Sequence, residues 1–337
     1  MATIAINPSP EMTRSLASRG IFSDDPVTIV DVGARWGFNG EWQVFGDALR
    51  VFCFEPDAEE CARLNAAASP NVTYIPAALS RRAGEAALYV TKLRASSGLY
   101  KTDMTYFSRL LNGSNGDTAS EERVQVTTLD EVLSRFGAPA IDFIKLDCEG
   151  AELDVLLGGP RVMAGHALVG LLSEFRFQKE INGCPTFSEL DTHVQQFGFR
   201  LFGMQFTHQS RRALPYPSAA DYRLPTGERF FAYTTRGQIM DGDALYFRDL
   251  LIPANAAVRR QASALQLLKA AAFFEIYSLN DCAAELLMTH RELLQPVVDC
   301  DDLLDRLTPR LRSQKTGFAE YIDAYFDPKR GVIGEQI

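Results

Sequence analysis

The stretch over residues 27–40, VTIVDVGARWGFNG, constrains the fold more strongly than any other part of the sequence. It opens with β-branched residues, reaches Asp31, and continues with glycines at Gly33, Gly37 and Gly40. Because glycine lacks a Cβ, the backbone there turns sharply and comes close to a ligand. The stretch predicts a buried strand that enters a nucleotide-type pocket. The alternative is an ordinary strand-to-loop junction.

Strands and helices alternate after this turn. Further strands are predicted at 50–55 and 72–78, separated by helices at 41–49 and 58–68. A β-α-β-α-β order predicts a parallel sheet with helices on both faces. Later strands are expected at 141–147, 168–173, 199–206 and 229–235, and none from about residue 243 onward.

The chain divides into three predicted parts. Residues 1–26 form an N-terminal extension, residues 27–240 a ligand-binding domain, and residues 241–337 an Ala- and Leu-rich helical region. The polar stretch within residues 80–128 departs from the strand–helix rhythm and is expected to be an insertion. Long inserted loops in compact domains are usually functional.

Composition excludes several classes of protein. A formal net charge of −9 opposes a nucleic-acid binder, because such proteins rely on cationic contacts to phosphate. No apolar run is long enough to span a bilayer, and the first residues lack the pattern of a signal peptide. The six cysteines form no C-x-x-C pair, so we expect reduced thiols in a cytoplasmic protein. Self-association, where it occurs, is expected through the helical region.

Four carboxylates end four predicted strands: Asp31, Glu55, Asp147 and Glu174. Ligands of open α/β sheets bind outside the carboxyl ends of the strands, where the strand order reverses. A single acid at a strand end is usually a cap or turn residue, but four in register indicate a site.

Glu55 has the most specific position of the four. It follows the glycine turn by about twenty residues, where a carboxylate binds the ribose hydroxyls of an adenosine. The glycines do not have the G-x-G-x-x-G spacing of a dinucleotide site, and Trp36 blocks the approach to a pyrophosphate. The turn therefore favours a non-phosphorylated adenosine ligand. A cap beside Pro56 is the alternative role for Glu55.

Three segments resemble the FkbM family of S-adenosylmethionine-dependent methyltransferases: VDVGARWG at 30–37, FEPD at 54–57, and IDFIKLDCEGAE at 141–152. The resemblance covers about residues 27–235. It implies a Rossmann-like class I methyltransferase fold of the α/β class: a seven-stranded, mostly parallel sheet whose last strand is antiparallel, with the helical region appended.

The resemblance also implies roles for individual residues. The Gly33 turn would wrap the methionine part of S-adenosylmethionine, Glu55 would bind its ribose, and residues 77–79 would lie near the adenine. Ser96 and Ser97 resemble a serine pair of the family's insertion. The expected cofactor-binding set is Asp31, Gly33, Ala34, Gly37, Glu55, Pro56, Ala78, Leu79 and Asp147.

Arg35 departs from the family pattern, which often has asparagine at this place. A cation next to a sulfonium is unfavourable. We therefore expect Arg35 to point at the methionine carboxylate or away to solvent.

Methyl transfer to a hydroxyl needs a base for the hydroxyl proton. Asp147 is the first candidate, followed by Glu174 and Glu149, with His208 weaker. Glu149 equally suits a structural role at the start of the next helix. Lys145, on the same strand as Asp147, is either a paired core lysine or part of the site. A divalent metal held by Asp147 and Glu149 has little support, because two carboxylates without further ligand spacing do not define a metal site.

The resulting hypothesis is O-methylation of a hydroxyl on a glycan, a sugar or a secondary metabolite, and this acceptor class rests on the resemblance. Two alternatives stay open. One is a non-catalytic interaction protein that keeps the methyltransferase fold, and the other is an NAD-type oxidoreductase, which the glycine spacing opposes.

Overall fold

The computed structural model describes residues 4–138, 140–219, 222–223, 227, 229–230, 233–310 and 314–327. The chain divides into two compact units. The first unit comprises residues 1–4, 28–39 and 50–255, and the second unit residues 5–27, 40–49 and 256–337. The three functional parts expected from the sequence, 1–26, 27–240 and 241–337, follow other bounds and stay a prediction.

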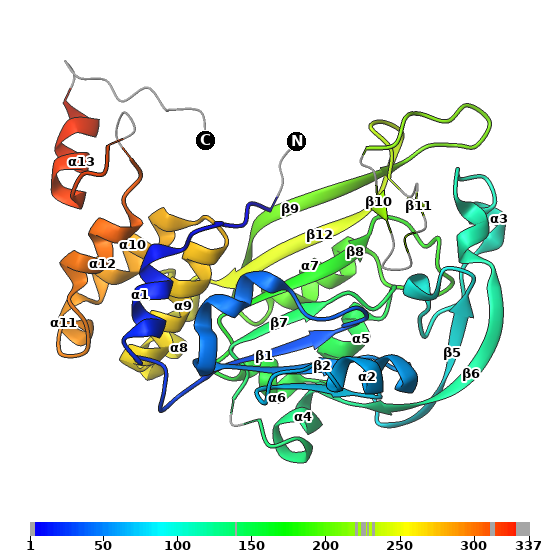
Figure 1. Cartoon of the computed structure of the whole chain (residues 1–337), viewed down its shortest axis with the longest axis horizontal. Helices are drawn as coiled ribbons and strands as arrows, with labels where there is room; N and C mark the ends of the chain where they lie inside the picture. Colours follow the sequence, from blue (N-terminus) through cyan, green and yellow to red (C-terminus); the bar gives the residue numbers. More distant parts are fainter. Residues whose placement is uncertain are drawn as a thin grey trace. The chain divides into compact units, whose positions relative to one another are not determined.

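The first unit is built on a seven-stranded sheet in the order β3-β2-β1-β7-β8-β12-β9 (Figure 1). Its strands in chain order are β1 (Val27–Val32), β2 (Leu49–Phe54), β3 (Val72–Ile75), β7 (Phe143–Leu146), β8 (Gly170–Arg176), β9 (Phe199–Gln209) and β12 (Gln238–Arg248).

Strand direction identifies the topology. β1 pairs with β7 in parallel, from Ile29 opposite Phe143 to Val32 opposite Leu146, and β7 pairs with β8 in parallel. β12 is antiparallel to both of its neighbours, β8 and β9. The expected mostly parallel sheet with an antiparallel last strand is confirmed.

The position predicted for that last strand is wrong. The sequence indicated residues 229–235, whereas the strand that enters the sheet is β12, which continues to Arg248. Residues 229–230 instead pair with 222–223 as a separate short ribbon, β11 (Arg229–Phe230) and β10 (Tyr222–Arg223); residues 231–232 lie outside the described part. β12 is 11 residues long, is buried over most of its length, and pairs with both β8 and β9.

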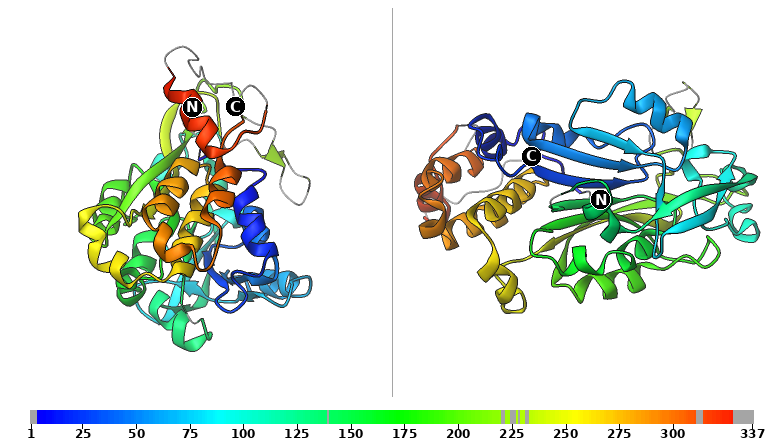
Figure 2. Two further views of the ribbon diagram at one scale, coloured as in Figure 1. Left: turned by 90° about the vertical axis from the view of Figure 1, so that its left-hand side faces the viewer. Right: turned by 90° about the horizontal axis from the view of Figure 1, so that it is seen from below.

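Helices lie on both faces of the sheet. The strand order runs outward from β1 toward β3 and in the opposite direction from β7 toward β8, so right-handed crossovers place the intervening helices on opposite faces. Figure 2 shows α2 on one side and the group α4–α7 on the other. Their bounds are α2 (Ala58–Asn65), α4 (Leu129–Arg135), α5 (Glu152–Leu157), α6 (Pro160–Ala164) and α7 (Phe187–Gln195).

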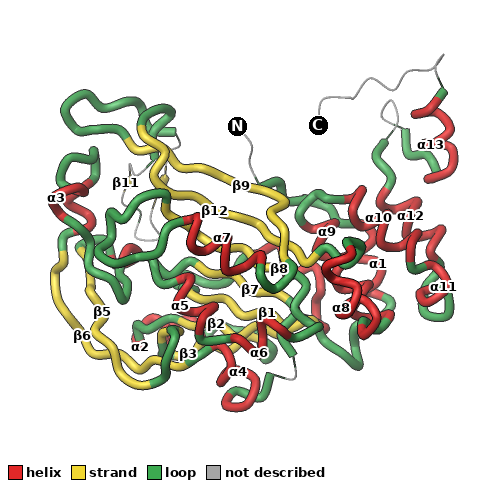
Figure 3. The backbone as a smooth tube through the Cα atoms, turned by 180° about the vertical axis from the view of Figure 1, so that it is seen from behind, coloured by secondary structure: helices red, strands yellow, loops and turns green. Residues whose placement is uncertain are grey.

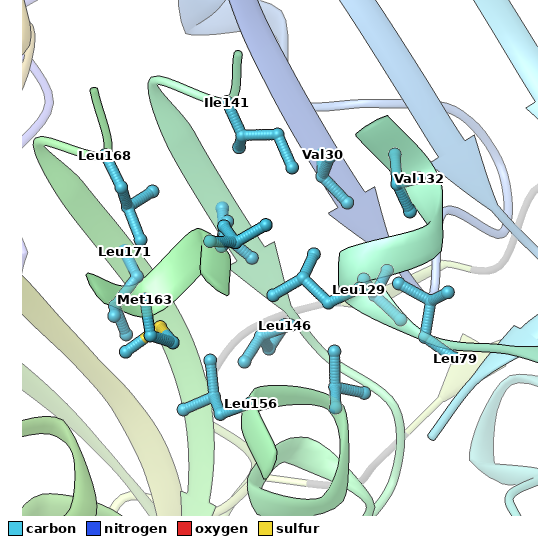
Figure 4. Close-up of a cluster of buried hydrophobic side chains, with 14 of the residues drawn as sticks. Val30, Leu79, Leu129, Val132, Ile141, Leu146, Leu156, Met163, Leu168 and Leu171 are labelled. Carbon is cyan, nitrogen blue, oxygen red and sulfur yellow. The ribbon is translucent and has the colours of Figure 1, made fainter. Parts of the chain in front are cut away.

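The core lies between the sheet and the group α4–α7. Val30 and Leu146 from neighbouring strands pack there with Leu129 of α4 and Leu156 of α5, and all four are buried (Figure 4). This packing fixes the carboxyl ends of β1 and β7 relative to each other, which is what a site at those ends requires.

The insertion forms a sheet of its own in the order β4-β6-β5, with β4 (Ala78–Leu79), β5 (Gly84–Thr91) and β6 (Thr118–Thr127). β5 and β6 run side by side as a long antiparallel pair (Figure 3). Between them lie η2 (Arg94–Ser96), α3 (Met104–Phe107) and η3 (Gly113–Gly116). Residues 118–122, which are mostly polar, form the first half of β6.

The second unit is helical, with α1 (Glu11–Ser18), η1 (Gly40–Ala48), α8 (Ala256–Gln261), α9 (Ala264–Ile276), α10 (Asn280–Thr289), α11 (Arg291–Leu294), α12 (Cys300–Leu307) and α13 (Phe318–Phe326). The short segment η4 (Pro253–Asn255), directly before α8, belongs to the first unit. α8 and α9 are separate helices, because Ser263 caps a new helix with Gln266. The helix expected over 41–49 is a 3₁₀ segment broken at Gly46, whose φ is +56°.

Candidate functional site

A pocket opens at the carboxyl ends of β1, β2 and β7, where the strand order reverses between β1 and β7. We call it the first pocket. Gly33, Glu55 and Asp147 line it from the strand ends, and residues 94, 95 and 97–99 of the insertion line it as well. It contains about 920 Å³ of space with its open mouth included, which suits a small-molecule site.

Glu55 is buried, with 6% of its surface exposed, and lines the first pocket directly after β2. Its Oε1 accepts a hydrogen bond from the backbone N–H of Asp57 at 2.9 Å. Burial raises the pKa of Glu55, while that hydrogen bond and the nearby Arg35 act against the shift. The carboxylate of Glu55 therefore lies at the wall of the first pocket, and its role toward a ribose stays a prediction.

Arg35 lines the first pocket and pairs with an acidic side chain there, so it does not point away to solvent. Its Nη1 lies 3.1 Å from Oδ2 of Asp57 and 3.9 Å from Oε1 of Glu55. Nη1 of Arg94, from the insertion, lies 2.9 Å from Oδ2 of Asp57. The side chain of Asp57 also caps α2 by accepting the N–H groups of residues 59 and 60. The carboxylate of Asp57 thus joins the glycine turn, α2 and the insertion beside the first pocket.

Lys145 is a paired lysine at the strand ends. Its Nζ lies 3.2 Å from Oδ1 of Asp31 and 3.3 Å from Oδ2 of Asp147, and it donates to the carbonyl oxygen of Gly33 at 3.3 Å. Burial alone would lower the pKa of Lys145, but the two carboxylates, Asp147 and Asp31, outweigh it and raise the pKa. Lys145 therefore stays charged and ties β7 to β1.

The segment after β7 is a tight turn. Glu149 has a φ of +57°, which is rare for a residue with a side chain, and Gly150 has a φ of +100°. Oε1 of Glu152 holds the turn by accepting the N–H groups of Cys148 and Gly150. Left-handed backbone at a non-glycine residue concentrates at functional sites. The structural role considered for Glu149 belongs instead to Glu152, since α5 begins there and not at Glu149.

A second pocket lies beyond this turn, with about 620 Å³ of space. Its charged lining consists of Glu149, Glu174, Arg176 and Asp241, and Glu149 lines the first pocket as well. Nη2 of Arg176 lies 2.6 Å from Oε2 of Glu149 and 3.2 Å from Oε2 of Glu174. Two of the predicted base candidates, Glu149 and Glu174, therefore meet on one guanidinium nitrogen.

Burial controls the ionisation of these carboxylates. It raises the pKa of Glu149 to about 8 and that of Glu174 well above its usual range, although the charge of Arg176 opposes both shifts. Carboxyl groups with raised pKa values act as acids or bases near neutral pH. Glu149 and Glu174, which line the second pocket, can therefore hold or accept a proton.

The structure brings most of the predicted site residues together. Those lining the first pocket are Gly33, Glu55, Pro56, Ala78, Leu79, Asp147 and Glu149; Glu174 and Glu149 line the second. Ser97 lines the first pocket and Ser96 the second. Asp31, Ala34, Gly37 and His208 line neither, and Asp31 is fully buried behind Lys145.

Three site residues were missed from the sequence: Arg94, Arg176 and Asp241. A usable signal existed for Arg176, because residues two apart on a strand share a face and Glu174 was already a candidate. Asp241 lies directly opposite Arg176 on β12. It was missed because the strand was placed too early in the chain.

Among the residues that the structure describes, no group of three or more His, Cys, Asp or Glu side chains could hold a metal ion. Asp147 and Glu149, the pair considered for this role, are bound to Lys145 and Arg176 respectively. Within the same described residues, no helix is long and apolar enough to cross a membrane.

Comparisons with known proteins give one family match. The family model described as "Methyltransferase FkbM domain" matches residues 31–201. This segment contains the strand-end carboxylates at 31, 55, 147 and 174, and the whole insertion. A comparison with curated proteins gave no significant match.

Several solved structures are similar at low identity. A TehB-like SAM-dependent methyltransferase from Corynebacterium glutamicum is 13% identical, with 70% of this chain and 93% of that chain covered and a TM-score of 0.28. A precorrin-6y C5,15-methyltransferase from Geobacter metallireducens is 11% identical, with coverages of 69% and 86% and a TM-score of 0.27. A 1,6-didemethyltoxoflavin-N1-methyltransferase from Burkholderia thailandensis, solved with bound 1,6-didemethyltoxoflavin and S-adenosylhomocysteine, is 12% identical, with coverages of 71% and 79% and a TM-score of 0.28.

Proposed function

The chain belongs to the FkbM family of methyltransferases, and on this premise we propose that it transfers a methyl group from S-adenosylmethionine in the first pocket to a hydroxyl of an acceptor. One observation carries the proposal: Glu55, at the end of β2, lines the same pocket as the Gly33 turn and Asp147. A buried carboxylate at that strand end suits two adjacent ribose hydroxyls.

The lining of the first pocket fits the remaining parts of this cofactor. Ala78 and Leu79, both buried, offer an apolar wall for the adenine, and the Gly33 turn offers backbone for the methionine part. Arg35 and Arg94 keep Asp57 paired. Glu55 is therefore the carboxylate of this wall that remains for the ribose.

Bound S-adenosylmethionine supplies an already activated methyl group, so the chain has to align the acceptor and take up a proton. Alignment of two reactants can contribute roughly 7–11 kcal/mol to the barrier reduction. The acceptor oxygen forms a bond to the methyl carbon while the carbon–sulfur bond breaks, and the hydroxyl proton passes to a carboxylate of this chain. A positioned base adds about 10²–10⁴-fold.

Glu149 is the best placed base among the predicted candidates. It lines both pockets, and its raised pKa suits proton transfer near neutral pH. Asp147 lines only the first pocket, and Lys145 holds one of its oxygens. Glu174 lines only the second pocket, and its carboxylate contacts the same guanidinium nitrogen of Arg176 as Glu149 does.

The proposed acceptor class is a glycan, sugar or secondary metabolite with a free hydroxyl. This class comes from the resemblance to the FkbM family. The proposed residues of the cofactor site are Gly33, Glu55, Pro56, Ala78, Leu79 and Asp147, which were predicted from the sequence and line the first pocket, with Arg94 added.

Isothermal titration calorimetry with S-adenosylhomocysteine tests the proposal. We expect wild-type protein to bind S-adenosylhomocysteine and not NAD. Glu55→Ala removes two charge-assisted hydrogen bonds to the ribose, on the order of 3 kcal/mol, and should weaken binding about a hundredfold. Glu59→Ala is the matched control, because Glu59 is an exposed carboxylate of α2 outside the pocket and should bind as wild type does.

The two alternatives make different predictions in the same experiment. An NAD-type oxidoreductase would bind NAD, and a non-catalytic interaction protein would bind neither ligand. Equal binding of S-adenosylhomocysteine by wild type and Glu55→Ala would refute the assignment of the site.

A further inference from the structure

We infer that the second pocket is the acceptor site and that it admits uncharged, hydroxyl-bearing groups while excluding anionic ones. The inference rests on the proposed function, because it takes the methyl donor to occupy the first pocket. It assigns a site to the acceptor and states a charge rule, namely that the acceptor carries no negative charge. Arg176 then positions Glu149 and Glu174 and does not bind an anion.

The location follows from Glu149 and the insertion. Glu149 lines both pockets, so a group in the second pocket lies across one side chain from the first. The insertion approaches the same point at Gly98, where a Cβ would lie 3.0 Å from the Cβ of Glu149. On either side of this approach, Ser97 lines the first pocket and Ser96 the second. The pockets are therefore neighbours that meet at Glu149.

The charge rule follows from the surroundings of Arg176. Among the described residues that line the second pocket, Arg176 is the only lysine or arginine, and 5% of its surface is exposed. Its Nη2 contacts Glu149 and Glu174, and its Nη1 lies 3.4 Å from Glu180 and 4.0 Å from Asp241. Four carboxylates thus surround one guanidinium.

Protonation of Glu149 and Glu174 does not give the second pocket a net positive charge. If Glu149 and Glu174 both hold protons, the charge of Asp241 still offsets that of Arg176. If they are ionised, the pocket carries a negative charge. In either state an anionic acceptor would be desolvated, and the described lining residues offer it no cation that is free of carboxylate partners, which is unfavourable. An acceptor without negative charge avoids that cost.

Neutral hydrogen-bonding groups also line the second pocket. Thr102, Asn112, Asn115 and Gln209 contribute hydroxyl and amide groups. Among the described residues, Nδ2 of Asn112 and Nε of the buried Arg176 are donors without a hydrogen-bond partner. Buried donors are normally paired, so both suit the oxygen of a bound hydroxylated group.

A pair of thiol reagents of opposite charge tests the charge rule without knowledge of the acceptor. Ser96→Cys places a thiol in the second pocket. Ser114→Cys, on an exposed position of the same insertion, is the matched control. Each full-length variant is treated with 2-(trimethylammonium)ethyl and 2-sulfonatoethyl methanethiosulfonate, and labelling at the introduced cysteine is followed by peptide mass spectrometry. Taking the ratio of the two rates removes the effect of thiol ionisation.

We expect the cationic reagent to be favoured at position 96, relative to position 114, on the order of tenfold, because a cleft lined by one sign of charge concentrates the opposite sign. Adding Glu174→Gln to Ser96→Cys should reduce that ratio. Equal ratios at positions 96 and 114, or faster labelling by the anionic reagent at position 96, would overturn the charge rule.

A second measurement tests whether the second pocket adjoins the donor methyl group. The sulfonium of S-adenosylmethionine is positive, and S-adenosylhomocysteine lacks that charge. We expect Glu149→Gln to weaken S-adenosylmethionine relative to S-adenosylhomocysteine by several-fold at pH 9, where Glu149 is ionised. Glu122→Gln, which alters another carboxylate of the first pocket, should preserve the wild-type preference. An unchanged preference in Glu149→Gln would overturn the acceptor assignment, whereas absence of binding by either ligand would refute the proposed function instead.

Discussion

Gly33 and Asp147 touch backbone to backbone: a Cβ at Gly33 would lie 1.7 Å from the carbonyl oxygen of Asp147. The φ of Gly33 is +82°, so a side chain there is also conformationally strained. The contact sets how closely the glycine turn after β1 approaches the end of β7. It brings two walls of the first pocket together at the point where the strand order reverses.

Gly33→Ala should therefore destabilise the fold and abolish binding of S-adenosylhomocysteine. The overlap is with backbone, which cannot rotate away, so we expect a loss of more than about 2 kcal/mol in the free energy of unfolding. Gly137→Ala is the control, since Gly137 has a φ of +72° but nothing within 4 Å of its Cβ position. It should cost about 1 kcal/mol and leave binding intact. Urea denaturation and calorimetry on both variants measure the difference, and equal losses would show that strain, not the contact, dominates.

Lys145→Met tests the pairing at the strand ends. The substitution removes the cation 3.2 Å from the fully buried Asp31, and loss of one partner from a buried ion pair costs about 3–5 kcal/mol. We expect a corresponding fall in the denaturation midpoint. The double variant with Asp31→Asn should recover part of that stability, because the buried charge is then gone. If the double variant is less stable than Lys145→Met alone, Lys145 does not act through Asp31.

Glu149 makes stability depend on pH. Its pKa rises from 4.5 to about 8 on folding, so between these values the folded state holds a proton that the unfolded state has lost. The stability that this group contributes is fully present below about pH 4.5 and is lost as pH rises toward 8. Glu149→Gln lacks the effect. We expect the melting temperature of the variant to rise relative to that of wild type as the pH is increased from 5 to 8.5, as thermal unfolding followed by circular dichroism would measure. A constant difference across this range would contradict the raised pKa.

The strand-end carboxylates were predictable because parallel strands end at one edge of a sheet. Asp31, Glu55, Asp147 and Glu174 were located from strand ends alone, and three of them line the two pockets. Asp31 does not, because its side chain points to Lys145 and is fully buried. Strand ends indicate the edge of the sheet, but the direction of a side chain depends on register and on its partner.

The contacts between distant segments were not predictable from one sequence. Arg94 reaches Asp57 from the insertion, and Arg176 meets Asp241 across two strands that are separated by β9 in the chain. Such pairs depend on loop path and strand register, which local patterns do not encode. The same holds for Glu149, whose left-handed backbone in a three-residue turn replaces the helix start expected there.

In the second unit, Glu275 caps a helix that lies far away in the chain. Its Oε1 accepts the N–H of Met12 at 2.9 Å, and its Oε2 accepts the N–H and the hydroxyl of Thr13 at 2.7 Å each. Pro10, at the N-cap of α1, makes no side-chain hydrogen bond, so the carboxylate of α9 satisfies the free N–H groups of the first turn. Glu275→Ala should leave two buried N–H groups without their acceptor, at about 1–3 kcal/mol each.

We therefore expect the amides of Met12 and Thr13 to exchange with solvent at least tenfold faster in Glu275→Ala than in wild type, as hydrogen exchange with mass spectrometry would measure. Glu275→Gln keeps one oxygen acceptor and should show a smaller increase. Amides of β7 in the first unit serve as the internal reference and should be unaffected. Because the cap acts on one turn, equal acceleration at α1 and β7 would indicate global unfolding rather than loss of a cap, and no acceleration at α1 would refute the capping role of Glu275.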